Sequence, residues 1–112
     1  MQIPFRAIIV FHAVARAGSI SRAADELRVT PSAVSQQIQA LELHLGTALT
    51  SRIGRNITLT EAGERYFEMI SREIEHIADV TSKLIVNRAA LKTRHAEVQG
   101  LVDRIAEATL AA

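Results

Sequence analysis

The segment from residue 19 to residue 42 constrains the fold of this chain more than any other. Its apolar positions fall into two groups at helical spacing, and the turn pair Thr30-Pro31 separates the groups. Ala23 and Ala24 are small enough to let a second helix cross close to the first. Two short helices around a tight turn form a helix-turn-helix, which leaves the outer face of its second helix free to enter a DNA major groove. The segment therefore predicts a DNA-binding module.

Residues that begin and end helices predict three helices in the first 45 positions. The expected spans are roughly residues 4–17, 20–27 and 31–45. Four residues are suited to cap them, namely Gly18, Ser19, Thr30 and Gly46. Pro31 would take the first position of the third helix, where a missing N–H costs nothing. The inward face of that helix is expected to carry Val34, Ile38, Leu41 and Leu45.

Two brief apolar runs come next, over residues 49–53 and 56–59, and they flank a glycine at position 54. The second run alternates apolar and polar residues, as a half-buried strand does. Glycine gives the backbone the freedom that a tight turn needs. The pattern predicts a β-hairpin wing, from which Arg52 and Arg55 would reach phosphates or a narrow minor groove.

A long amphipathic stretch opens after Thr60, a suitable helix cap. From Phe67 to Thr109 its apolar residues recur every three or four positions, as in a coiled coil. So small a domain cannot bury such a stripe, so a partner helix is expected, most simply from a second copy of the chain. The stripe could instead pack back on its own domain. The residues assigned to dimerisation are Phe67, Ile70, Ile74, Ile77 and Leu84.

The stripe weakens in its second half, where Arg88 and His95 occupy seam positions and Asn87 could interrupt the helix. One helix of residues 61–112, or two shorter ones with a break near residue 87, both fit this pattern. The expected domains are residues 1–60 for DNA binding and 61–112 for a linker and dimerisation helix with a helical extension.

Charge is divided unevenly between these two parts. Residues 1–60 carry six arginines and three acidic residues, whereas residues 61–112 carry seven basic and nine acidic residues. An excess of arginine in the first part suits the neutralisation of DNA phosphates. Solvated helices also show such differences, so the charge supports the DNA-binding interpretation without deciding it.

Other classes of function lack their sequence signals. The chain has no cysteine, and its four histidines are too scattered for a ligand set, so no metal or other cofactor is expected. No phosphate-binding loop or nucleophile–base pattern occurs, so an enzyme is not expected. The first apolar run, Ile8 to Val10, is too short to cross a bilayer and follows no basic leader, so a cytoplasmic protein without membrane contact is expected.

The combined motifs resemble the amino-terminal domain of LysR-type transcriptional regulators over roughly residues 3–86. The resemblance rests on the order F-x-A-V-A-x-x-G-S-I-S-R-A-A-x-x-L-x-V-T-P-S-A-V-S-Q-Q-I-x-x-L-E-x-x-L-G, followed by R-x-G-R-x-I-x-L-T-E-A-G. It implies a mainly α fold, a winged helix-turn-helix of three helices and a short hairpin, followed by a long helix that dimerises antiparallel to its mate. It also implies a bacterial regulator that binds a dyad-symmetric operator in double-stranded DNA.

The positions that contact DNA in that family can be carried over by motif. The resemblance assigns the start of the recognition helix to Thr30, Pro31 and Ser32, base contacts to Ser35 and Gln36, a backbone contact to Gln39, and the wing arginine to Arg52 or Arg55. A plain solvated helix face is the alternative for these polar residues. Many members have arginine where this chain has Gln36, so its base preference should move from guanine toward adenine. Thr50 replaces a usual phenylalanine, which suggests looser packing of the wing.

The family continues into an effector domain of about two hundred residues, an ordinary domain size. This chain stops at Ala112, so it is expected to be a fragment or a short relative, without a site for a small-molecule effector. The first interpretation is a sequence-specific regulator acting as a homodimer or a higher oligomer. The alternatives are a non-specific DNA-coating protein and a coiled-coil interaction module that forms mixed dimers with a full-length partner.

Overall fold

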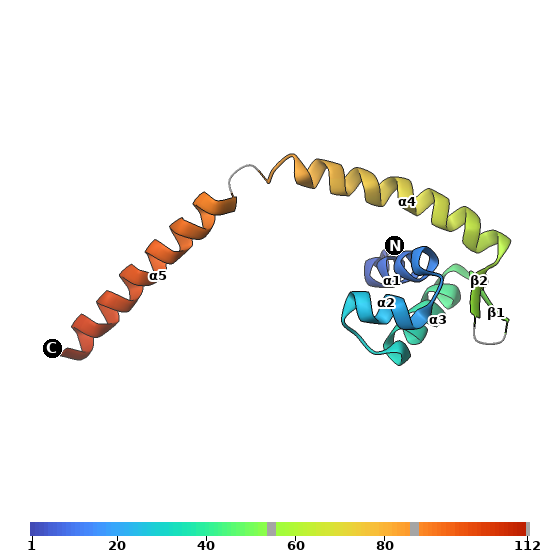
Figure 1. The fold of residues 1–112 in the computed structure, drawn as a ribbon, viewed down its shortest axis with the longest axis horizontal. Coiled ribbons are helices and arrows are strands. Elements are labelled where there is room, and N and C mark those ends of the chain that lie inside the picture. The colour runs from blue at the N-terminus through green and yellow to red at the C-terminus, as the bar shows by residue number, and fades with distance from the viewer. Residues whose placement is uncertain (54–55, 86–87, 112) are drawn as a thin grey trace. The chain divides into compact units, whose positions relative to one another are not determined.

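The computed structural model describes residues 1–53, 56–85 and 88–111, and it is mainly helical (Figure 1). The elements in chain order are α1 (Phe5–Ala17), α2 (Ile20–Leu27), α3 (Pro31–Leu45), β1 (Thr50–Ile53), β2 (Asn56–Leu59), α4 (Glu61–Ser82) and α5 (Arg88–Ala111). The first five elements form the winged helix-turn-helix that the sequence predicts. The expected turn at Gly54 and Arg55, and the possible break at Asn87, lie outside the described residues.

The expected capping residues lie at four ends of the first three helices. The hydroxyls of Ser19 and Thr30 each accept the backbone N–H three residues ahead, at 3.3 and 3.1 Å. Pro31 occupies the first position of α3. Gly18 and Gly46 end α1 and α3 with φ of +69° and +71°, a conformation that favours glycine. The sharp ends of these helices therefore follow from local chemistry.

The core lies where α1, α2 and α3 meet (Figure 1). Its largest fully buried side chains are Phe11, Val14, Val34, Leu41 and Leu49. Ala23 and Ala24 are buried in the same core, and their small side chains allow the close approach of α2. The prediction for Leu45 was wrong, since this residue is 40% exposed. The last turn of α3 extends past the side chains that could have covered it.

The wing is an antiparallel pair in which Thr50 opposes Leu59 and Ile53 opposes Asn56. β1 begins at Thr50 and not at Leu49, because the N–H of Leu49 bonds to a side chain of α3 and not to the opposite strand. Its N–H donates to Glu42 and its carbonyl accepts from Thr60. Leu49 thus serves the core, and the strand starts one residue later.

The carboxyl-terminal part contains two helices, which settles the question that the sequence left open. Contacts divide the chain into two compact units, Met1–His76 and Ile77–Ala112, so the division falls inside α4. The division of roles at residue 60 stays a prediction, since a functional boundary need not coincide with a contact boundary.

The beginning of α4 packs on its own domain. Tyr66, Phe67 and Ile70 contact the buried cluster that contains Phe11 and Leu49. The ring centroids of Phe11 and Tyr66 are 5.7 Å apart, an ordinary spacing for an aromatic pair. The first part of the apolar stripe therefore follows the alternative in which it packs back on the same chain.

His12 on α1 faces this contact, with its ring centroid 5.3 Å from that of Phe67. Burial lowers the pKa of His12 below its usual 6.5, and the nearby Arg16 lowers it further, against smaller opposing effects of Glu75 and Glu26. The folded state therefore prefers the neutral imidazole, whereas the unfolded chain takes up the proton at a higher pH.

We expect stability to fall as the pH drops below about 6.5, the pKa of an unperturbed histidine. The loss is complete once the pH lies below the pKa of His12 in the folded protein. Thermal unfolding between about pH 7.5 and pH 5.5 measures this dependence. His12→Gln should flatten it, and an equal slope in that variant would assign the effect to other groups.

Candidate nucleic-acid interface

The outer face of α3 presents polar side chains to solvent. Ser32, Gln36 and Gln39 are exposed and lie four and three residues apart, which places them on one side of the helix. Pro31 is exposed at the start of the same face. The hydroxyl of Thr30 is engaged in capping, so its free capacity for a further contact is reduced. These residues form a continuous polar strip beside the turn.

Ser35 and Arg52 connect this strip to the wing. The Nη2 of Arg52 donates to the Oγ of Ser35 at 3.3 Å, while the arginine itself remains exposed. The contact aims a cation from β1 along the face of α3. Arg55, the other wing candidate, lies outside the described residues.

A polar cleft of about 540 Å³ lies along the same face. Its lining joins the start of α2, the start of α3 and the wing, and includes Ser21, Ser32, Ser35, Arg52 and Asn56. Ser21 and Asn56 were not among the residues that the sequence singled out. Both are short exposed polar residues beside the predicted turns, but only the fold brings them next to α3.

The wing is attached to α3 through Glu42, whose role the sequence did not indicate. Its Oε2 accepts the N–H of Leu49 at 2.8 Å and the N–H of Thr50 at 3.2 Å. The hydroxyl of Thr50 lies 3.5 Å from the same oxygen. Thr50, whose side chain suggested a more loosely packed wing, is therefore attached to α3 by polar contacts.

We expect Glu42→Ala to lower the free energy of unfolding by about 1–3 kcal/mol, because it leaves two partly buried N–H groups without an acceptor. Glu42→Gln keeps an acceptor oxygen and should lose less. Urea unfolding measures both variants, and amide exchange at Leu49 and Thr50 should accelerate in the alanine variant. Equal losses in the two variants would contradict the role of the carboxylate as an acceptor.

A second attachment joins the wing to α4. The Thr60 hydroxyl donates to the carbonyl of Ala48 at 2.7 Å and accepts the N–H of Gly63 at 3.0 Å. The backbone N–H of Thr60 donates to the carbonyl of Leu49 at 3.0 Å. Gly63 is buried, and a Cβ added to it would lie 2.0 Å from that same oxygen. The start of α4 therefore depends on the absence of a side chain at position 63.

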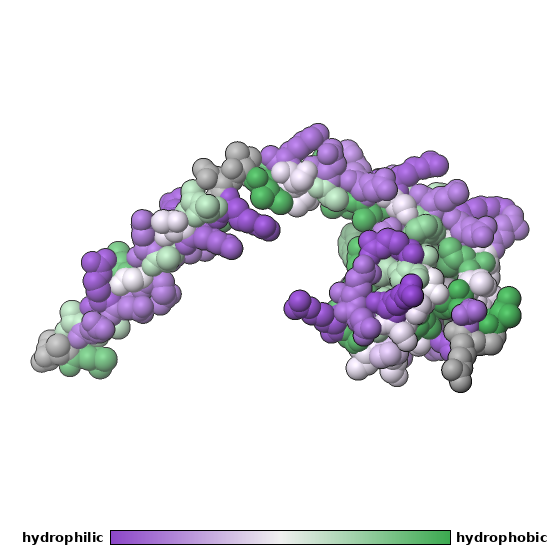
Figure 2. Space-filling model, in the orientation of Figure 1, coloured by the Kyte–Doolittle hydropathy of each residue, from purple (hydrophilic) through white to green (hydrophobic). Residues whose placement is uncertain are grey.

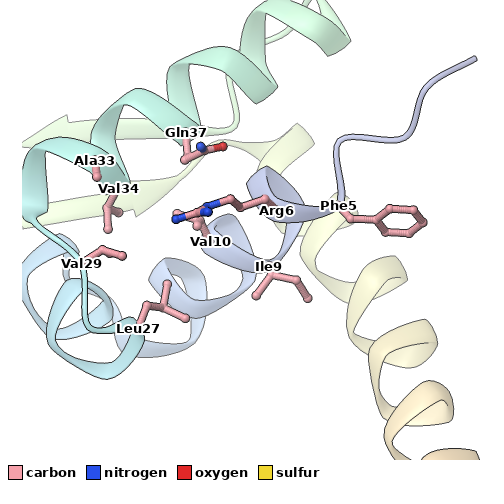
Figure 3. Close-up of a pocket in the computed structure, with 9 residues that line it drawn as sticks. All are labelled: Phe5, Arg6, Ile9, Val10, Leu27, Val29, Ala33, Val34 and Gln37. Carbon is pink, nitrogen blue, oxygen red and sulfur yellow. The ribbon is translucent and has the colours of Figure 1, made fainter.

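A separate cleft of about 440 Å³ lies between α1, the end of α2 and the start of α3 (Figure 3). Its walls are mostly apolar, with Val10, Leu27, Val29 and Val34 among them, and the Arg6 side chain extends into it (Figure 3). Gln37 lines this cleft, although it follows Gln36 directly in sequence. The two glutamines therefore face different surroundings.

The remaining stripe residues lie beyond this packed region. Ile74 is half-buried and Ile77 is 58% exposed. Leu84 was expected on the helical stripe, but it lies in a turn after the end of α4 and is 84% exposed. The helix ends before it, so Leu84 cannot continue the heptad spacing.

The described part of the chain lacks two other features, a membrane-spanning helix and a metal-binding cluster. No helix there combines the length and the apolar character that a membrane span requires. No group of three or more histidine, aspartate, glutamate or cysteine residues is placed there to hold a metal ion.

Residues 5–64 match the family model described as "Bacterial regulatory helix-turn-helix protein, lysR family". The glycine cleavage system transcriptional activator of Escherichia coli (strain K12) is 46% identical over 81 residues, which cover 72% of this chain and 27% of that protein. The RuBisCO operon transcriptional regulator of Allochromatium vinosum is 38% identical over 96 residues, covering 82% of this chain and 32% of that protein. The chain thus spans about a third or less of the length of these relatives.

Solved structures of the same kind share the fold. The crystal structure of the CbnR_DBD–DNA complex is 37% identical, with a TM-score of 0.64, and the match covers 81% of this chain and 99% of that chain. The BenM_DBD/catB site 1 DNA complex is 27% identical, with a TM-score of 0.68, and covers 80% and 97%. Both of these solved structures contain DNA.

Proposed function

This chain belongs to the lysR family of bacterial regulatory helix-turn-helix proteins, and on that premise we propose that it regulates transcription by binding operator DNA sequence-specifically as a dimer. The observation that carries the proposal is the exposed polar strip on α3, flanked by the cation of Arg52. A strip of this kind offers hydrogen-bonding groups to base edges.

Each residue of the strip has a role in this proposal. Gln36 reads a base edge, and an adenine suits its paired donor and acceptor. Ser32 and Ser35 contact bases or neighbouring phosphates. Thr30, Pro31 and Gln39 position the helix against the sugar-phosphate backbone, and Arg52 and Arg55 place positive charge on the flanking phosphates.

The proposed dimer uses the exposed side of α4. Phe67 and Ile70 already contact their own core, so they offer a partner only the part of their surface that remains free. The seam therefore centres on Ile74 and Ile77, and Leu84 contributes from the turn that follows. Two copies would place two α3 helices in successive major grooves on one side of the duplex, as dimeric helix-turn-helix proteins do.

Fluorescence anisotropy of the full chain tests the proposal. The probes are the duplex upstream of its own gene and a shuffled duplex of equal composition, from about 50 to 200 mM salt. A preference for the native duplex that persists as salt rises would support a sequence-specific regulator. Equal, steeply salt-sensitive binding would favour a DNA-coating protein, and no binding at low salt would favour the interaction module. The salt slope reports the number of phosphates that the chain neutralises, including any contacted by the wing arginines.

Ile77→Asp should weaken the dimer by about tenfold or more, because it places a charge in an apolar contact. Ile77 is exposed in the single chain, so the variant should unfold like the parent. Sedimentation velocity over a range of protein concentrations measures the dissociation constant. His76→Asp is the matched control, since the same carboxylate then lies about 100° around α4 from Ile77, away from the seam. An unchanged dimer in Ile77→Asp would place the contact away from α4.

A further inference from the structure

The helix α5 is exposed along its whole length. Every residue from 88 to 110 is exposed, including four apolar ones whose exposed fractions are 54% at Leu91, 56% at Val98, 51% at Val102 and 58% at Ile105. Figure 2 shows hydrophobic residues along this helix among hydrophilic ones. Most of the stability of a helix in a protein comes from packing of its apolar side. The apolar side chains of α5 therefore need another surface to pack against.

Four large apolar residues of α5 form one seam with His95 and Thr109, in alternating steps of four and three residues, whereas Leu101 and Leu110 lie off this seam. The seam positions are Leu91, His95, Val98, Val102, Ile105 and Thr109. This spacing is that of a two-stranded coiled coil. The seam is also symmetric about residue 100, so that reversal exchanges Val98 with Val102 and His95 with Ile105. Two antiparallel copies of α5 can therefore overlap along the seam, so that each seam position of one helix lies opposite a seam position of the other.

Charge along α5 favours the antiparallel arrangement. Residues 88–99 carry three cations, Arg88, Lys92 and Arg94, against one anion, whereas residues 100–111 carry one cation against Asp103 and Glu107. A parallel pair would set each half beside a half of the same sign. An antiparallel pair sets the basic half of each helix beside the acidic half of the other, and it opposes the two helix dipoles.

We infer that α5 forms an antiparallel two-stranded coiled coil with α5 of a second copy of this chain. Val98 then lies opposite the partner's Val102 at the centre of the contact. This contact is separate from the proposed seam on α4 and does not depend on DNA binding.

Cysteine pairs test this contact directly, because the chain has no cysteine of its own. Full-length Val98→Cys and Val102→Cys are oxidised mildly, each alone and as a mixture. We expect disulfide-linked dimers mainly in the mixture. In the antiparallel pair, two copies of the same position are displaced along the axis by four residues, about 6 Å, which exceeds what a disulfide tolerates.

Two further substitutions show whether the seam itself makes the contact. Adding Ile105→Asp to both cysteine chains should lower the yield of linked dimer about tenfold, since it buries a charge in the seam. Adding Ala96→Asp, on the outer side of α5, should leave the yield within about twofold. Equal loss from both would overturn the seam.

The remaining outcomes also decide the question. Efficient linking of each single variant to itself would overturn the antiparallel arrangement. No linking in a chain that still sediments as a dimer would overturn the α5 contact and mean that another segment holds the two copies together. DNA binding measured on the same samples stays informative, because either result on α5 leaves the anisotropy test of α3 intact.

Discussion

Gly63→Ala should be the most destabilising single methyl addition in the winged domain. The new Cβ would lie 2.0 Å from the carbonyl oxygen of Leu49, and that oxygen also accepts the N–H of Thr60. Neither partner is the end of a flexible side chain, so the backbone itself must move. Alanine gains about 1 kcal/mol of helix propensity over glycine. Overpacking typically costs about 1–3 kcal/mol and occasionally more, and a clash with backbone atoms lies at the upper end, so we expect a net loss of about 2 kcal/mol.

Gly100→Ala is the matched control for this prediction. It makes the same change inside α5, where the added Cβ would meet nothing within 4 Å. Helix propensity then acts alone, and helicity by circular dichroism should rise or stay constant. Urea unfolding monitored at Tyr66, which packs in the domain core, compares the two variants. A Gly63→Ala domain as stable as the parent would show that the junction adjusts at little cost.

Gln36→Ala should remove base discrimination and leave the fold intact. Its side chain is exposed, so truncation costs little stability, whereas a lost bidentate contact to a base is worth about 1–3 kcal/mol. Affinity for the native duplex should therefore fall by about five- to 150-fold, with little change on the shuffled duplex. Anisotropy on both probes gives the ratio. Equal losses on the two probes would contradict base reading by this residue.

Gln37→Ala is the corresponding control. It removes the same side chain from the neighbouring position, which lines the apolar cleft and not the polar strip. We expect its ratio of native to shuffled affinity to match that of the parent chain. A loss of discrimination in Gln37→Ala would assign base reading to a different side of α3.

Local chemistry made much of the fold predictable. Ser19, Thr30 and Pro31 have side chains that suit one position at a helix start, and the structure places them there. The wing followed from a short alternating run beside a glycine. The polar strip on α3 was also predictable, because helical spacing alone places Ser32, Gln36 and Gln39 on one side of the helix once its inward side is known.

The attachments between elements were not predictable in the same way. Glu42 resembles any surface carboxylate until the chain folds back and brings two N–H groups to it. Arg28 ends α2 with φ of +58°, where the sequence offers neither glycine nor asparagine as a signal. The apolar stripe predicted a partner without indicating which one, so only the structure shows that Phe67 and Ile70 contact their own core.

The backbone of Leu49 is held from both sides, by Glu42 of α3 at its N–H and by Thr60 at its carbonyl. Leu49 thus helps to tie the beginning of α4 to α3, the helix that would enter the groove. In a dimer held by α4, such a stiff connection would leave the distance between the two α3 helices little freedom to change. We therefore expect the protein to tolerate altered bases better than inserted base pairs, since each insertion also rotates one half-site around the duplex. Any remaining mismatch in spacing would have to be absorbed by bending the DNA.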